Sequence, residues 1–189
     1  MRLPPVLSPD DLPAAELYAA RLDGDVFGLG DCFAPVDEVE QPSHRAAATH
    51  AGLSDRLIAE QLSAAWVWGA LDVAPRHRQF CVATGARVSH SPARWMTLRE
   101  VVIDSDEIVD LLGNAVTSPL RTVVDLVRFS EAFGSVESRA VQRLVLGSHV
   151  SLAEASESIE RRRNLPNKRR ALARLRLCAL PAAEPPSAA

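Results

Sequence analysis

The stretch VTSPLRTVVDLV, residues 116–127, decides how the chain around it is expected to fold. Ser118 can cap a helix whose first residue is Pro119, because a proline at that position lacks only an N–H that would have no partner anyway. The apolar residues that follow recur at the spacing of one helix face, and they are Leu120, Val123, Val124 and Val127. The stretch therefore predicts the end of a strand that runs directly into a helix packed on the core.

The polar residues of this stretch allow two interpretations. Arg121 and Asp125 are four residues apart, so they can pair on the helix surface for about 0.3–0.5 kcal/mol. Alternatively, Arg121, Thr122 and Asp125 form part of a recognition surface. We expect the Arg121–Asp125 pair to be an architectural tie within a structural motif, which comprises Thr117, Ser118, Pro119, Arg121 and Asp125.

Strands are predicted mainly upstream of this helix. Apolar runs indicate strands over residues 79–83, 99–103, 107–112 and 115–117. A hairpin-type turn at Gly113-Asn114 joins the last two. Residues 61–69 fit a helix in which Trp66 and Trp68 pack in the core. The alternative for the two rings is a base-stacking surface, which requires exposed rings near cations.

The N-terminal segment predicts a reduced winged helix. Ser8 and Pro9 mark the start of a helix that runs to about Leu22, and two short strands follow over 26–29 and 31–34. A helix followed by a small β-ribbon is the ending of a winged helix-turn-helix, but the chain before it is too short for the two further helices. Nine acids against three arginines in the first 45 residues make this segment a poor DNA-binding wing.

Together these patterns predict an α+β fold. Residues 1–45 form the reduced winged-helix-like part. Residues 46–178 form a mixed domain in which helices cover a mainly antiparallel sheet. Its last helices are expected at 137–146, 151–163 and 168–178, and Ser151 with Glu154 has the form of a capping box. Residues 179–189 are rich in proline and alanine and are expected to form a disordered tail.

Composition indicates a cytoplasmic protein. No apolar run is long enough to span a bilayer, and the N-terminus lacks the apolar region of a signal peptide. The three cysteines, Cys32, Cys81 and Cys178, are odd in number and form no CxxC pair, so a zinc ribbon is excluded and a disulfide framework is not expected.

The charge of the chain is strongly asymmetric. Residues 1–160 carry 13 arginines against 23 acids, whereas residues 161–189 carry seven arginines and one lysine against Glu184 alone. Arginine grips phosphate oxygens in a bidentate manner, so this end can meet nucleic acid. The alternative is a solvated basic face, or one neutralised by the acidic remainder of the chain. The candidate nucleic-acid-binding residues are Arg161, Arg162, Arg163, Lys168, Arg169, Arg170, Arg174 and Arg176.

No catalytic, cofactor-binding or metal-binding constellation is recognisable. The chain has no phosphate-binding glycine loop and no GxSxG elbow, and its five histidines are dispersed. A nuclease that uses two carboxylates and a lysine is disfavoured, because the single lysine, Lys168, follows no acid in a D/E-x-K pattern. We therefore expect no enzyme activity, no cofactor and no metal.

Three segments together resemble the AbiEi-like antitoxin family of actinobacteria. They are residues 63–69 (SAAWVWG), 115–126 (AVTSPLRTVVDL) and 163–170 (RNLPNKRR), and the resemblance extends over about residues 8–178. It implies a role in type IV toxin–antitoxin or abortive-infection systems, with a nucleotidyltransferase toxin as functional partner. In that family an N-terminal winged helix typically binds the operator. Some relatives instead join this module to a C-terminal endonuclease domain, which we do not expect here because the lysine of such a nuclease is missing. The N-terminal winged helix is also expected to be truncated and is acidic, which departs from the family pattern.

The leading hypothesis is a non-enzymatic antitoxin-like or transcription-regulatory protein that contacts DNA or RNA through its basic C-terminal helices. A second hypothesis is a protein-interaction module without nucleic-acid binding. A third is a degenerate nuclease-linked protein.

Overall fold

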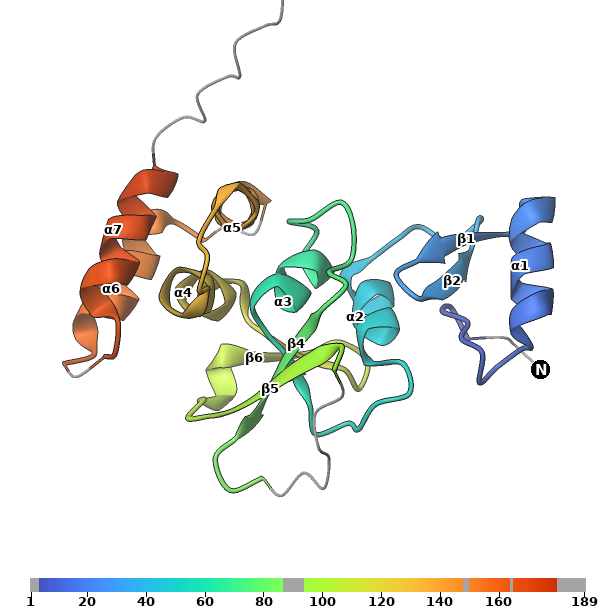
Figure 1. The fold of residues 1–189 in the computed structure, drawn as a ribbon, viewed down its shortest axis with the longest axis horizontal. Helices are drawn as coiled ribbons and strands as arrows, with labels where there is room; N and C mark the ends of the chain where they lie inside the picture. Colours follow the sequence, from blue (N-terminus) through green and yellow to red (C-terminus); the bar gives the residue numbers. More distant parts are fainter. Residues whose placement is uncertain (1–3, 87–93, 148–149, 164, 180–189) are drawn as a thin grey trace, which may run out of the picture.

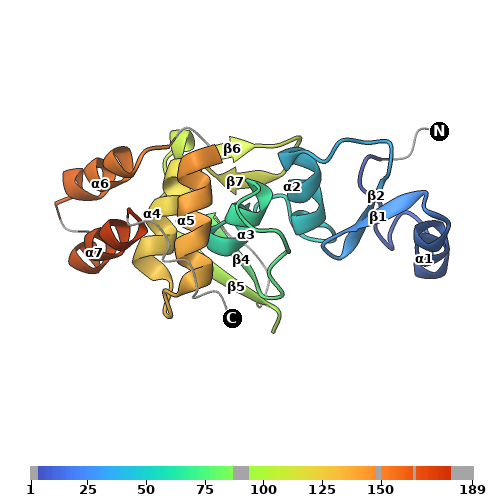
Figure 2. The ribbon, with the colours of Figure 1, turned by 90° about the horizontal axis from the view of Figure 1, so that it is seen from above.

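The computed structural model describes residues 4–86, 94–147, 150–163 and 165–179 of the 189-residue chain. In this part of the chain it shows a mixed α+β protein with seven α-helices, a two-stranded sheet and a five-stranded sheet. The molecule is elongated, with helix α1 (Ala14–Asp23) at one end and helices α6 (Leu152–Arg161) and α7 (Lys168–Cys178) at the other (Figures 1 and 2). The predicted tail lies, apart from Ala179, outside the described residues.

The N-terminal part is a helix followed by an antiparallel ribbon of β1 (Val26–Leu29) and β2 (Cys32–Pro35). Helix α1 begins after Pro13, so the predicted start at Pro9 was wrong. The preceding residues form a turn instead, in which Ser8 donates from both its N–H and its hydroxyl to the Asp11 carboxylate. A small apolar core joins α1 to the ribbon and consists of Leu7, Leu17, Val26 and Phe33.

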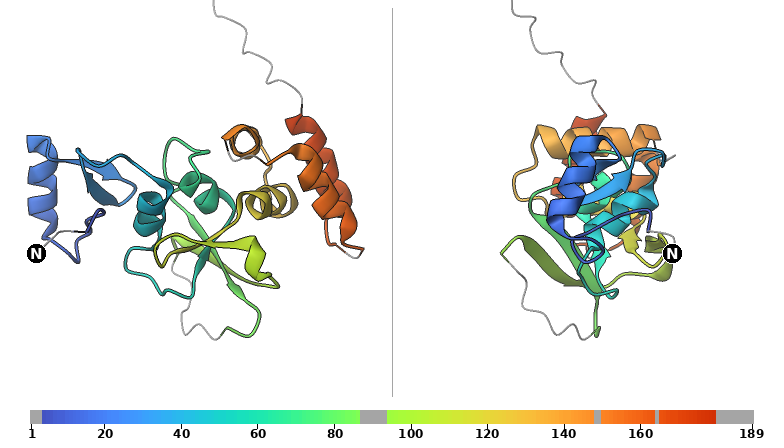
Figure 3. Two further views of the ribbon diagram at one scale, coloured as in Figure 1. Left: turned by 180° about the vertical axis from the view of Figure 1, so that it is seen from behind. Right: turned by 90° about the vertical axis from the view of Figure 1, so that its right-hand side faces the viewer.

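Helix α2 (Pro42–His50) lies between this ribbon and the five-stranded sheet (Figures 1 and 3). The predicted domain boundary between residues 45 and 46 falls inside it. The central elements are β3 (Ile58–Ala59), α3 (Gln61–Val67), β4 (Arg78–Ala83), β5 (Met96–Val101), the 3-10 helix η1 (Ser105–Glu107), β6 (Ile108–Asp110) and β7 (Ala115–Thr117).

The order of strands in the large sheet is β5-β4-β3-β7-β6. Strand β3 is antiparallel to β4 and β6 to β7, but β4 runs parallel to β5 and β3 parallel to β7. The prediction of a mainly antiparallel sheet was therefore wrong. A short apolar run indicates a strand but not its direction, because the direction depends on how the connection between two strands returns the chain.

Two apolar cores hold the rest together. One lies between the sheet, α2 and α3, and contains Phe80, Val67 and Val116. The other is built around α4 (Pro119–Phe129), which packs against α3, α5 (Ser135–Gly147), α6 and α7. Residues 121–128 of α4 are all buried, so this helix is enclosed on all sides rather than along one stripe.

The hairpin between β6 and β7 turns at Leu112-Gly113, one residue earlier than predicted. Leu111 and Asn114 exchange backbone hydrogen bonds of 3.0 and 3.3 Å across a two-residue loop. Both loop residues have positive φ, 57° at Leu112 and 86° at Gly113, as a type I′ turn requires. A left-handed conformation costs a leucine about 1–2 kcal/mol, and asparagine adopts it more readily.

We expect Leu112→Asn to raise the free energy of unfolding by about 0.5–1 kcal/mol, because it relieves this strain. Leu112 is 80% exposed, so little packing is lost. Urea denaturation measures the change. The control is Leu146→Asn, which removes an equally exposed leucine from helix α5 and should bring no gain. Equal effects of the two substitutions would contradict the assignment of strain to Leu112.

Candidate nucleic-acid interface

The start of α4 is built as the sequence indicates. Pro119 occupies the first turn, and the Ser118 hydroxyl accepts a hydrogen bond of 3.3 Å from the backbone N–H of Arg121. The hydroxyls of Thr117 and Thr122 lie 2.7 Å apart. The Trp68 indole N–H donates to the carbonyl oxygen of Thr117 at 2.9 Å. These contacts fix α4 against β7 and α3.

The two tryptophans are parts of the interior. Trp66 is buried, and Trp68 is half-buried with its N–H used on Thr117. Neither presents the exposed ring that base stacking requires, so the core interpretation is confirmed.

The Arg121–Asp125 pair is buried, which corrects the expectation of a surface pair. Nε of Arg121 donates to Oδ2 of Asp125 at 2.8 Å, and the two side chains are 4% and 0% exposed. At this depth the attraction is hardly screened by solvent, and either charge would be costly without the other. The pair is an architectural tie, and Arg121 does not lie on an exposed face.

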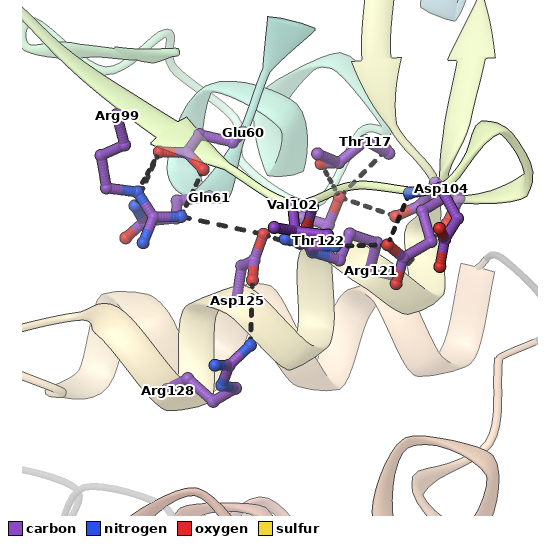
Figure 4. A network of polar contacts seen from close by, with 12 residues as sticks. Glu60, Gln61, Arg99, Val102, Asp104, Thr117, Arg121, Thr122, Asp125 and Arg128 are labelled. Atoms are coloured by element: carbon purple, nitrogen blue, oxygen red, sulfur yellow. Dashed lines mark hydrogen bonds and ion pairs between the residues drawn. The ribbon is translucent and has the colours of Figure 1, made fainter. Parts of the chain in front are cut away.

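A larger ion-pair network surrounds this pair (Figure 4). Arg99 forms a bidentate pair with Glu60, and its guanidinium also lies 3.9 Å from Oδ2 of Asp125. Arg128 approaches the other oxygen of Asp125 at 3.9 Å. On the far side, Arg121 also binds Glu107.

Glu107 connects the network to the basic cluster, which we define as the eight Lys and Arg residues of 161–176. It binds Arg121 through one carboxylate oxygen and Arg162 through the other, at 2.5 Å. The ion-pair network thus consists of four arginines and three carboxylates, namely Arg99, Arg121, Arg128, Arg162, Glu60, Asp125 and Glu107. It ties β5, α4 and the end of η1 to the segment between α6 and α7.

Burial and charge act in opposite directions on these groups. Burial raises the pKa of Asp125 and Glu60, and the neighbouring guanidinium groups limit the rise. Although burial disfavours the charge of Arg121, its carboxylate partners raise its pKa. Burial likewise works against ionisation of Glu107, but the Asp104 N–H and the two bound arginines hold its pKa below the usual value. The carboxylates are therefore engaged by arginines, and Glu60 and Asp125 are closed off from solvent.

Two buried atoms of the network have no hydrogen-bond partner among the described residues, Oδ1 of Asp125 and Nε of Arg128. Burial lowers the pKa of Arg128, and its guanidinium instead stacks over the Phe129 ring at 4.4 Å from the centroid. Arg128 is thus the least well matched cation in the network.

Five of the eight predicted binding residues have hydrogen-bond or ion-pair partners among the described residues, and three have none. Arg161 pairs with Glu157, and Arg162 with Glu107. Lys168 donates to the carbonyl oxygens of Glu160 and Arg162 at the end of α6. Three residues remain exposed with no hydrogen bond or ion pair in the part of the chain described: Arg163, Arg169 and Arg176.

The other two cations fasten α7 to α4. Arg170 donates to the carbonyl oxygen of Arg128 and Arg174 to that of Val127, both at 2.9 Å. These bonds satisfy carbonyl groups that the last turn of a helix leaves without partners. Arg169 and Arg176 are seven residues apart, so they lie on one outward face of α7, about 10 Å apart along the helix. The possible contact face is smaller than the sequence suggested and is held rigidly.

Sequence reasoning missed most of the network. Glu60 and Arg99 lie far from Asp125 in the chain, and no local pattern joins them to it. Arg128 had a local signal, because it follows Asp125 by three residues on α4. Glu107 had one local signal, since Asp104 and Glu107 have the spacing of a capping box, which the structure shows around η1.

The described residues contain neither a metal-binding cluster nor a membrane-spanning helix. No group of three or more His, Cys, Asp or Glu side chains there is arranged to hold a metal ion. No helix there has the length and apolar character needed to cross a membrane.

Comparisons with known proteins show the fold alone. No model of a known protein family matches the chain, and a search of curated proteins also finds no match. The crystal structure of the RV2827C protein from Mycobacterium tuberculosis is similar, with a TM-score of 0.51 and 16% sequence identity. The similarity covers 95% of this chain and 74% of that one.

Proposed function

We propose that the protein is a non-enzymatic, antitoxin-like or transcription-regulatory protein of the cytoplasm that contacts nucleic-acid phosphates with its C-terminal end. One observation carries this proposal: Arg163, Arg169 and Arg176 point outward without partners in the described residues. Residues 161–179 contain eight Lys and Arg and no Asp or Glu. Hydrogen bonds to carbonyl groups leave the charge of Lys168, Arg170 and Arg174 in place, so these cations add to the positive field.

The anchoring of α7 suits this role. Because Arg170 and Arg174 bind the end of α4, and Arg162 binds Glu107, the helix presents its free arginines at fixed positions. A preorganised cationic face loses less conformational entropy on binding than a mobile tail.

We also propose that the N-terminal part is a reduced winged helix. Helix α1 precedes the β1–β2 ribbon, and an antiparallel bridge between Leu7 and Phe33 adds a third short segment to it. Its acidic charge opposes DNA contact, so we assign it a packing role. It lies at the opposite end of the molecule from α7 (Figure 2).

The antitoxin role rests on the sequence resemblance. It implies a nucleotidyltransferase toxin as functional partner. Co-production of this protein should then restore growth to cells that make a nucleotidyltransferase encoded beside its gene, and failure to restore growth would count against this part of the proposal.

Binding to duplex DNA at several salt concentrations tests the nucleic-acid contact. Three or four phosphate contacts predict a slope of log affinity against log salt of about −3 to −4. The variant Arg169→Glu/Arg176→Glu should reduce the magnitude of that slope by about 2 and weaken binding equally for unrelated sequences. Fluorescence anisotropy measures both quantities.

The matched control is Arg94→Glu/Arg139→Glu, which changes the net charge by the same amount at exposed arginines outside α7. It should retain most of the affinity. No binding at low salt, or equal losses in the two variants, would reject the proposal and favour a protein-interaction module.

A further inference from the structure

A cavity of about 520 Å³ lies between the N-terminal ribbon and the central domain. Its size is within the range of about 300–1,000 Å³ of small-molecule sites. Its walls come from α1, the β1–β2 turn, α2, α3 and residues 72–78. It is therefore formed where the two parts of the molecule meet, and at a distance from the basic face of α7.

Four arginines line this cavity: Arg21, Arg45, Arg76 and Arg78. Two of them are held rigidly by the fold. Arg45 pairs with Glu40 and donates to the carbonyl oxygens of Trp66 and Leu71 at 2.8 and 3.1 Å. Arg78 pairs with Asp31 at 2.5 Å and donates to the Thr49 carbonyl oxygen at 3.2 Å.

The other two arginines are unmatched. Arg21 extends from α1 across the ribbon, where its Cζ lies 3.6 Å from the position that a Cβ would take at Gly28. Arg76 is exposed two residues before the start of β4. Neither has a hydrogen bond or an ion pair within the residues that the structure describes.

The acids of the lining do not compensate these two charges. Asp31 and Glu40 are used by Arg78 and Arg45. The remaining acid, Asp72, binds Arg143 of α5 at 2.6 Å. Every carboxylate of the lining thus has another cation as partner, and two guanidinium groups remain for a ligand.

We propose that this cavity binds a small phosphate monoester, with Arg21 and Arg76 holding the phosphate. Two unmatched guanidinium groups fit a dianion in charge and in hydrogen-bonding capacity. Val73 and Ala74 provide apolar lining for the organic part of the ligand. The ligand would bridge α1 and the central domain and so hold the two parts together. The inference does not depend on the proposed nucleic-acid contact.

A polyanion fits this cavity poorly. Asp31 and Asp72 lie at its rim with side chains 85% and 74% exposed, so a nucleic-acid backbone running across the opening would meet them. The geometry therefore favours a small ligand.

Calorimetric titration of the full chain with inorganic phosphate, and separately with phenyl phosphate, tests the proposal. We expect both to bind, with phenyl phosphate binding more tightly. Arg21→Met and Arg76→Met should each weaken the phosphate affinity about tenfold, the effect of one lost charge-assisted hydrogen bond. Both residues are exposed and unpartnered, so the variants should fold normally.

Arg139→Met is the control, since Arg139 is exposed and does not line this cavity. It should leave the affinity unchanged. Absence of phosphate binding, or equal weakening by Arg139→Met, would overturn the proposal. Displacement of phosphate by duplex DNA would reassign the cavity to nucleic acid and overturn it as well.

Discussion

Replacing Asp125 with alanine is expected to lower the free energy of unfolding by about 3–5 kcal/mol, the cost of removing one partner from a buried ion pair. Asp125 is fully buried, and its loss leaves the buried Arg121 and Arg128 without their shared carboxylate. Urea denaturation at low temperature measures the effect. Asp125→Asn keeps the shape of the side chain, so its free energy of unfolding should lie between those of Asp125→Ala and wild type.

A double-mutant cycle separates the pair from general damage. The double variant Arg121→Met/Asp125→Leu should lose less stability than the losses of Arg121→Met and Asp125→Leu added together. In each single variant one buried charge is left without its partner, whereas in the double variant neither charge remains. A loss for Asp125→Ala below about 1 kcal/mol, the range of an exposed pair, would contradict the buried network.

Replacing Glu107 with glutamine should destabilise the protein by about 2 kcal/mol at neutral pH, because two charged hydrogen bonds weaken at once. The effect is smaller than that of Asp125→Ala, since the Arg162 side chain is 38% exposed and its pair is screened by solvent. Asp106→Asn is the control, because Asp106 is exposed, and it should change stability by less than about 0.5 kcal/mol.

The effect of Glu107→Gln should also depend on pH. The pKa of Glu107 in the folded protein lies below its ordinary value of 4.5, so its ionised form stabilises the fold above that pH. This contribution is lost as the pH falls through the lowered pKa. The difference in free energy of unfolding between wild type and Glu107→Gln should therefore be largest above about pH 5 and should decrease in more acidic solution. A gap that stays constant down to about pH 3 would show that the ion pairs contribute little.

Local structure was largely predictable where one segment carries its own signal. The Ser118 cap with Pro119 and the Ser151–Glu154 capping box both occur as expected. The ribbon at residues 26–35 and the last helix also formed near their predicted positions. Such features depend on backbone groups within a few residues of one another, so sequence spacing is enough to reveal them.

The turn at Leu112-Gly113 and the start of α1 show the limit of local signals. Asn114 is a residue type typical of turns, yet the turn lies at Leu112-Gly113. Pro9 is typical of a helix start, yet α1 begins at Ala14. Strand pairing and the Ser8–Asp11 contacts decided between alternatives that differ by one or a few residues.

The sequence by itself determined that Arg121 and Asp125 would meet on α4 and that positive charge would collect near the C-terminus. Only the tertiary structure decided that the pair is buried, because Glu60, Arg99 and Glu107 come from other elements. It also decided which cations of the basic cluster remain free. Arg170 and Arg174 are used by the end of α4, whereas Arg169 and Arg176 face outward. Burial and long-range pairing depend on how distant segments pack, and the spacing of residues along one helix does not contain that information.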